Sequence, residues 1–131
     1  MVTLFDNPYI VVRHDEAKDT VWVERTSATS RDPSAATEVL AGVEKALLTI
    51  VAAKSTLVFD ARKAQGRNDE AFEKTVMPKW FELTRLFRRR ATIVSTPVGV
   101  LQSQRLNREA HIDAATFTDE GELEAWLSRG G

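Results

Sequence analysis

The organisation of the chain is clearest around Thr56-Leu57-Val58-Phe59-Asp60, a short apolar run that ends in an acid. Such a run is typical of a buried strand in the parallel part of a sheet. Upstream, Asp32-Pro33 favours a helix start, because Asp caps free N–H groups and Pro suits the first helical position. An amphipathic helix is therefore predicted over Ser34–Ala53. Its apolar residues at helical spacing are Leu40, Val43, Leu47 and Ile50.

Downstream, Ala61–Asn68 is polar, contains Gly66 and is interpreted as a loop. Asp69–Arg90 is a second helical stretch, with Pro78 inside it. Because proline removes a backbone donor and clashes with the preceding turn, we expect a kink, or two short helices with Pro78 opening the second. The apolar positions of this stretch are Phe72, Val76, Trp80, Leu83 and Phe87.

Strands and helices continue to alternate towards the end of the chain. Ala91–Thr96 is predicted as a buried strand, Val100–Ala110 as a shorter helix and Ala115–Phe117 as a last short strand. A final helix follows Asp119, with Glu122 placed for a capping arrangement. Its apolar stripe consists of Leu123, Trp126 and Leu127.

The beginning of the chain predicts an antiparallel hairpin of two strands, Tyr9–His14 and Thr20–Arg25. The expected order is ββαβαβαβα. Alternation of strands and helices requires crossover connections, so the fold class is α/β, with a mixed, mostly parallel sheet covered by helices.

Composition points to one globular domain. The chain has 131 residues, of which 43% are apolar and 28% charged, and its net charge is −1. The absence of cysteine excludes disulfides, thiolate catalysis and thiolate metal sites. No apolar run is long enough to span a membrane, and the first residues lack a basic signal region, so a cytoplasmic location is expected.

Three stretches carry a resemblance to a known family. They are the hairpin and helix leading to Leu57-Val58-Phe59-Asp60, the strand Thr92-Ile93-Val94, and Ala115–Leu127, where a Phe followed by acids precedes Trp126-Leu127. Together they resemble the SpoIIAA-like fold of the STAS domains (sulfate transporter and anti-sigma-factor antagonist) and their STAS-like bacterial relatives. The resemblance covers nearly the whole chain. It implies a single STAS-like domain, 1–131, that works in signalling through protein interaction.

One feature of the signalling members is missing. Those proteins carry a phosphorylatable Ser at the start of the helix after the central strand, but no Ser or Thr occurs from Leu57 to Lys74. The phosphorylation switch is therefore not transferred to this chain. Asp69 and Glu70 supply permanent negative charge at this position, either as a mimic of the phosphorylated state or as ordinary helix-capping acids.

The middle of the chain is basic. Eleven basic and five acidic residues between Ala61 and His111 give a local charge of +6. Because loops that leave the carboxyl ends of parallel strands meet at one edge, we expect a ligand- or partner-binding surface there. The alternative is that these arginines are solubilising charges, or partners for Asp60 and Glu109. The candidate binding residues are Arg62, Gly66, Arg67, Asn68, Asp69, Arg105 and Arg108.

No catalytic, metal or cofactor site is predicted. His14 and His111 lack metal-binding spacing, and although Asp113 could orient His111, no nucleophile lies nearby in the sequence. No nucleotide-binding glycine motif occurs. Leu86-Phe87-Arg88-Arg89-Arg90 is interpreted as basic residues closing a helix, where the helix dipole favours them, and not as a nucleic-acid site.

The sequence therefore predicts a non-catalytic STAS-like module that binds an unknown protein partner. A homodimer through an edge strand or a helix face is left open. In that case Trp22 would form a dimer surface with Tyr9 and Val11, whereas the alternative buries Trp22 under a helix. The alternative function is a small-anion or apolar-ligand (lipid) binding domain, with a pocket lined by Phe72, Trp80 and Phe87. An enzyme comes third.

Overall fold

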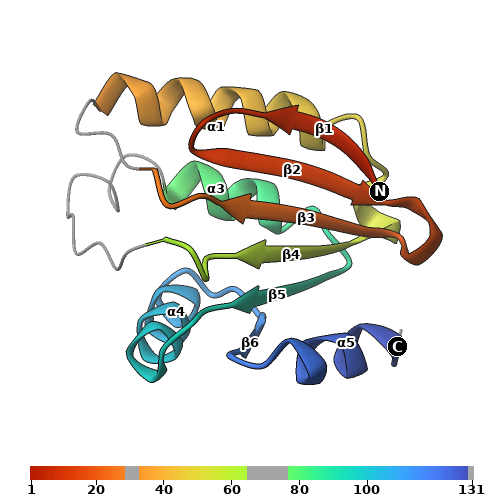
Figure 1. The fold of residues 1–131 in the computed structure, drawn as a ribbon, viewed down its shortest axis with the longest axis vertical. Coiled ribbons are helices and arrows are strands. Elements are labelled where there is room, and N and C mark those ends of the chain that lie inside the picture. Colours follow the sequence, from red (N-terminus) through yellow and green to blue (C-terminus); the bar gives the residue numbers. More distant parts are fainter. Residues whose placement is uncertain (29–32, 65–76, 130–131) are drawn as a thin grey trace.

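The computed structural model describes residues 1–28, 33–64 and 77–129, which build one six-stranded sheet (Figure 1). The strands lie side by side in the order in which they occur along the chain. The first three pair antiparallel, and β3 to β6 pair parallel. They are β1 (Val2–Asp6), β2 (Ile10–Asp15), β3 (Thr20–Arg25), β4 (Thr56–Asp60), β5 (Arg89–Ile93) and β6 (Ala115–Phe117).

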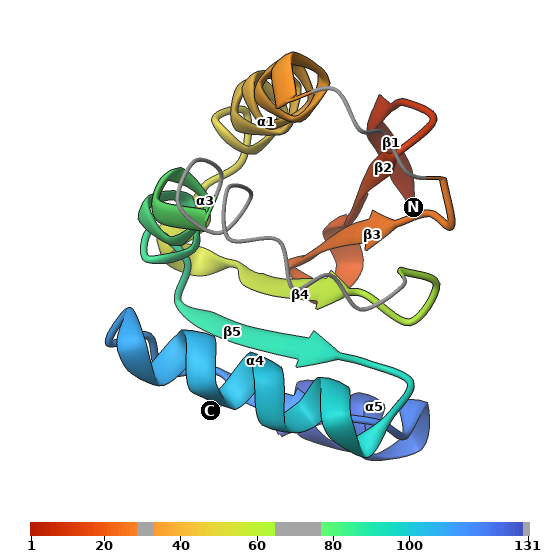
Figure 2. The same ribbon diagram turned by 90° about the vertical axis from the view of Figure 1, so that its left-hand side faces the viewer.

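Helices cover both faces of the sheet. Because each crossover from β3 to β6 leads to the next strand in the same direction, crossovers of one hand place their helices on one face. These helices are α1 (Pro33–Leu47), α3 (Met77–Thr84) and α4 (Pro97–Glu109). The last helix, α5 (Glu120–Ser128), lies on the opposite face (Figure 2). None of the helices in the described segments is long and apolar enough to cross a bilayer.

The core is divided by the sheet into two apolar clusters, because successive side chains of a strand point to opposite faces. In β3, Val21 and Val23 pack with α1, α3 and the end of α4, while Trp22 packs with Leu123 of α5. Trp22 is thus buried under a helix, the second of its two expected positions.

The α/β class, the antiparallel hairpin and the mainly parallel remainder are confirmed. The predicted order omitted β1, which pairs with β2 through an irregular register between Thr3 and Phe5. Phe5 also packs against α1 at Gly42, where an added Cβ would lie 2.5 Å from the Phe5 ring. A glycine in this helix therefore allows the edge strand to approach closely.

Helices α1 and α4 have boundaries that differ from those predicted. The helix expected to reach Ala53 ends at Leu47, where β-branched residues follow and the Thr49 hydroxyl donates to the Ala46 carbonyl. The helix expected from Val100 begins at Pro97, because the Thr96 side chain accepts the N–H of Gly99.

The three arginines do not close a helix. Helix α3 includes Pro78 in its first turn and ends at Thr84, and Arg89 and Arg90 belong to β5. Their guanidinium groups nevertheless reach carbonyls at helix ends. Arg89 donates to Trp126 and Leu127 in the last turn of α5, and Arg90 donates to Thr84 and Phe87 after α3. The part of the predicted stretch before Met77, residues 69–76, lies outside the described residues.

Candidate functional site

The carboxyl edge of the sheet brings two connections together. Strands β4 and β5 are parallel neighbours, and the N–H of Ala61, just after β4, donates to the carbonyl of Ile93 at the end of β5 (2.9 Å). The segments that follow Asp60 and Ile93 therefore start side by side, as the parallel arrangement predicts. Of the candidate residues, Gly66, Arg67, Asn68 and Asp69 lie outside the described residues.

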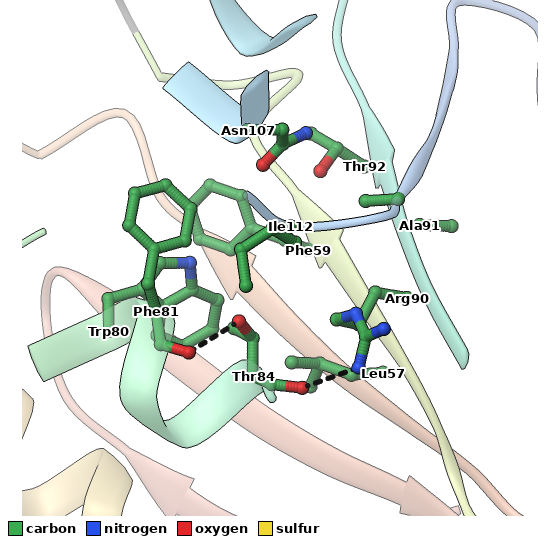
Figure 3. A pocket seen from close by; sticks show the side chains of 11 residues that line it. Leu57, Phe59, Trp80, Phe81, Thr84, Arg90, Ala91, Thr92, Asn107 and Ile112 are labelled. Atoms are coloured by element: carbon green, nitrogen blue, oxygen red, sulfur yellow. Dashed lines mark hydrogen bonds between the residues drawn. The ribbon is translucent and has the colours of Figure 1, made fainter. Parts of the chain in front are cut away.

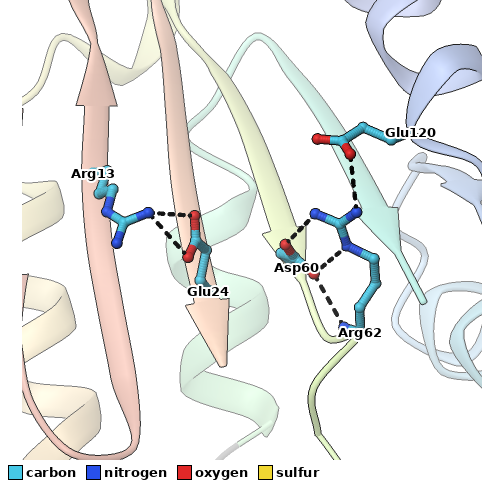
Figure 4. Close-up of polar contacts among 5 residues, drawn as sticks. All are labelled: Arg13, Glu24, Asp60, Arg62 and Glu120. Carbon is cyan, nitrogen blue, oxygen red and sulfur yellow. Dashed lines mark hydrogen bonds and ion pairs between the residues drawn. The ribbon is translucent and has the colours of Figure 1, made fainter. Parts of the chain in front are cut away.

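Arg62 is held at this edge by two carboxylates (Figure 4). Its Nε and Nη2 donate to Oδ1 and Oδ2 of Asp60 at 3.0 and 2.8 Å, and its backbone N–H also donates to Oδ1 at 3.0 Å. Its Nη1 reaches Oε2 of Glu120 at 3.3 Å. This bidentate arrangement fixes the guanidinium plane and ties the end of β4 to the first turn of α5.

Electrostatics keep both members of the central pair charged. Burial would raise the pKa of Asp60, but the side-chain and backbone hydrogen bonds from Arg62, with the charges of Arg62 and Lys63, outweigh it and lower this pKa. The hydrogen bond to Asp60 raises the pKa of Arg62. The pair is therefore a permanent structural clamp, and neither group is free to act as a general acid or base near neutral pH.

A second charged pair lies on the neighbouring strands. Arg13 Nη1 of β2 donates to both carboxylate oxygens of Glu24 in β3, at 3.1 and 3.3 Å (Figure 4). Glu24 is the register partner of Asp60 across β3 and β4, so both carboxylates project from the same face of the sheet. The Arg13–Glu24 and Asp60–Arg62 pairs therefore lie on the same face of the sheet, near its carboxyl edge.

Helix α4 carries Arg105 and Arg108 away from Arg62. It begins at Pro97, beside the carboxyl edge, and runs back along β5 (Figure 2). At 1.5 Å per residue these arginines lie about 12 and 17 Å along its axis. Arg105 also pairs with Glu109 at 3.2 Å. The structure thus shows Arg62 and Arg105 as partners of Asp60 and Glu109, and binding of a ligand by either stays a prediction.

A small cavity lies between α3 and α4 against β4 and β5 (Figure 3). Its volume is about 20 Å³, enough for one water molecule. Ligand pockets usually occupy roughly 300–1,000 Å³. Trp80 lines it, Phe87 is buried in the same core cluster as Trp80 and is not among the lining residues, and Phe72 lies outside the described residues. This cavity is therefore not the pocket that an apolar-ligand carrier needs.

The histidines form no recognisable site. Nε2 of His14 is buried without a hydrogen-bond partner, and His111 has a positive φ of 56° in the turn after α4. Across residues 1–28, 33–64 and 77–129, no three His, Asp or Glu side chains gather as they would around a metal ion.

Two long-range interactions, one at the site and one at the start of β5, could not be predicted from the sequence. Glu120 is 58 residues from Arg62, and Arg89 reaches across to α5, where its guanidinium also stacks 4.4 Å from the centre of the Trp126 ring. Neither contact could be predicted from the sequence, because the two partners are far apart along the chain. Comparison with family models, with curated proteins and with solved structures finds no match to this chain.

Proposed function

We propose that the chain is a non-catalytic, STAS-like interaction module that binds a protein partner at the carboxyl edge of its sheet. The observation that supports this proposal is the Asp60–Arg62–Glu120 clamp, which fixes the start of the connection after β4 against both β4 and α5. A connection anchored in this way starts from a defined position. Its first residues are already ordered before a partner binds, so less conformational entropy is lost and binding is favoured.

The element order supports the same proposal. Because β4 and β5 are parallel neighbours, the connections that follow them begin side by side and can form one continuous surface at the carboxyl edge. The carboxylates of the clamp neutralise the charge of Arg62. The proposed contacts with the partner are therefore made by residues that follow it, such as the exposed Lys63, and Arg67, a binding residue predicted from the sequence. No Ser or Thr occurs from Leu57 to Lys74, so the proposal includes no phosphorylation switch at this position.

The experiment compares two charge reversals in protein purified from its source cells. Arg67→Glu changes the proposed surface, whereas Lys54→Glu makes the same change on an exposed residue before β4, at the opposite end of the strands. Native mass spectrometry is expected to show one stoichiometric protein partner that Arg67→Glu removes and Lys54→Glu retains, with circular dichroism unchanged. A tightly retained small molecule, or equal partner loss in both variants, would contradict the proposal.

A further inference from the structure

The turns that follow α1 and α3 meet at the amino edge of the parallel strands. The N–H of Arg88 donates to the carbonyls of Ala52 (3.2 Å) and Ser55 (3.0 Å), so the connection into β5 lies against the connection into β4. Figure 1 shows these helix ends at the opposite end of the strands from the connection after β4. This end is therefore distinct from the proposed partner surface.

Three large apolar side chains project from these turns into solvent: Leu48, Val51 and Leu86, which are 68%, 63% and 53% exposed. We call them the helix-end patch. The same turns also supply inward-facing apolar residues, because Leu47 and Phe87 are buried in the main core cluster. The core is thus filled by their neighbours, and packing gives no reason for the three outward side chains to be apolar.

Basic residues flank the three apolar residues along the chain in both segments. They are the exposed residues Lys45, Lys54, Arg85 and Arg88. The two carboxylates of these segments, Glu44 and Glu82, both pair with Lys79, at 2.8 and 3.5 Å. Exposed apolar side chains flanked by basic residues match the chemistry of an anionic bilayer, which offers a negative surface above an apolar interior.

Two neighbouring segments border this surface. The β2–β3 turn lies beside the start of β4, because the N–H of Thr56 donates to the carbonyl of Asp19 at 2.8 Å. The end of α4 lies beside Arg85, which donates to the carbonyl of Ala110. These borders carry charges of both signs: the acids Asp15, Glu16, Asp19, Glu109 and Asp113 stand beside Lys18, Arg105 and Arg108, and Glu109 pairs with Arg105. The turns at the ends of α1 and α3 carry basic residues and no acidic ones, so contact with an anionic surface is expected there.

We infer that the helix-end patch docks the protein on an anionic lipid bilayer as a peripheral contact. Leu48, Val51 and Leu86 enter the headgroup boundary, and the surrounding lysines and arginines pair with lipid phosphates and carboxylates. The three exposed side chains lie on the turns after α1 and α3, which contact each other through the N–H of Arg88. This inference is independent of the protein partner at the carboxyl edge, which would remain accessible while the opposite end faces the membrane.

Vesicle co-sedimentation of the full chain tests the inference with two matched pairs of variants. Lys54→Glu reverses one of the charges that flank the patch, and Lys63→Glu reverses the charge of an exposed residue after β4. Leu86→Ser removes an apolar side chain from the patch, and Leu101→Ser removes an equally large one that is 68% exposed on α4. Circular dichroism checks that all four variants remain folded.

The wild-type chain is expected to bind vesicles of phosphatidylserine mixed with phosphatidylcholine, and to bind phosphatidylcholine alone far more weakly. Lys54→Glu should weaken binding at least about fivefold, since one basic residue near an anionic surface contributes about that much. Leu86→Ser should weaken it about tenfold, while Lys63→Glu and Leu101→Ser should change little. No binding at low salt, equal losses within either pair, or a dimer that Leu86→Ser dissociates in sedimentation would overturn the inference.

Discussion

Asp60→Asn is the most informative single change in this fold. The Asp60 side chain is only 12% exposed and accepts three N–H groups of Arg62, two from the guanidinium and one from the backbone. Asparagine has the same size and keeps one acceptor oxygen, but it loses the charge and turns an NH₂ group towards a guanidinium donor. The variant therefore removes one charge-assisted hydrogen bond and sets two donors against each other.

The free energy of unfolding should fall by about 2 kcal/mol at pH 7. Hydrogen bonds to charged groups contribute about 1.5–3 kcal/mol, whereas fully exposed ion pairs contribute at most about 1 kcal/mol. The Asp60–Arg62 pair lies between these cases, because the Arg62 side chain is 33% exposed. In a domain of this size the loss corresponds to a decrease in Tm of about 6–10 °C.

The loss also has a defined pH dependence. The folded pKa of Asp60 lies below the unfolded value of 3.8, so its stabilisation is complete above that value and disappears as pH falls through the folded pKa. Urea unfolding followed by tryptophan fluorescence should show a constant gap between wild type and variant from neutral pH to about pH 5, which narrows in acid. Glu109→Gln, in an exposed pair, should cost at most about 0.5 kcal/mol. A difference in unfolding free energy between wild type and Asp60→Asn below about 0.5 kcal/mol at pH 7 would contradict the stabilising role of the Asp60–Arg62 pair. A difference that stays the same in acid would also contradict it.

Three further changes test the packing around α5 and β6. Leu123→Ala removes a fully buried side chain and should lower the free energy of unfolding by about 3 kcal/mol in urea titrations, and a cost under about 1 kcal/mol would contradict the packing of α5 on the sheet. Arg89→Met frees the carbonyls of Trp126 and Leu127, so amide exchange at the end of α5 should accelerate, with a loss of about 1–2 kcal/mol; unchanged exchange would argue against this anchor. Thr116→Val replaces a buried hydroxyl that has no partner and should raise the Tm, whereas a lower Tm would show that this hydroxyl is satisfied in solution.

The fold was largely predictable because the central strands combine apolar character with short length. Thr56–Asp60 was assigned correctly, since a strand buried on both faces needs apolar residues at nearly every position. Strand β1 was not predicted. It has only five residues, lies at the edge of the sheet and pairs with an irregular register, so its apolar and polar residues do not alternate clearly. The start of β5 was not predicted, because two charged residues, Arg89 and Arg90, are unusual in a central strand. They are accommodated there by hydrogen bonds to carbonyls that only the tertiary fold brings near.

The site was predictable only where its contacts are local. Asp60 and Arg62 are two residues apart, so their pairing could be anticipated as an alternative to ligand binding. Glu120 could not be linked to them, because the contact depends on where α5 crosses the sheet. Arg105 and Arg108 were grouped with Arg62 because the start of α4 lies at the carboxyl edge, but the length of the helix separates them from it.

Site-specific photo-crosslinking in the source cells tests the proposed partner surface most directly. A photoreactive residue at Lys63 lies on the connection after β4, and one at Glu16 lies on an exposed turn at the other end of the strands. A single protein adduct is expected from position 63, which Arg67→Glu abolishes, and no adduct of that mass is expected from position 16. The same adduct from position 16, or none from position 63 in cells that make the protein, would contradict the proposed partner surface.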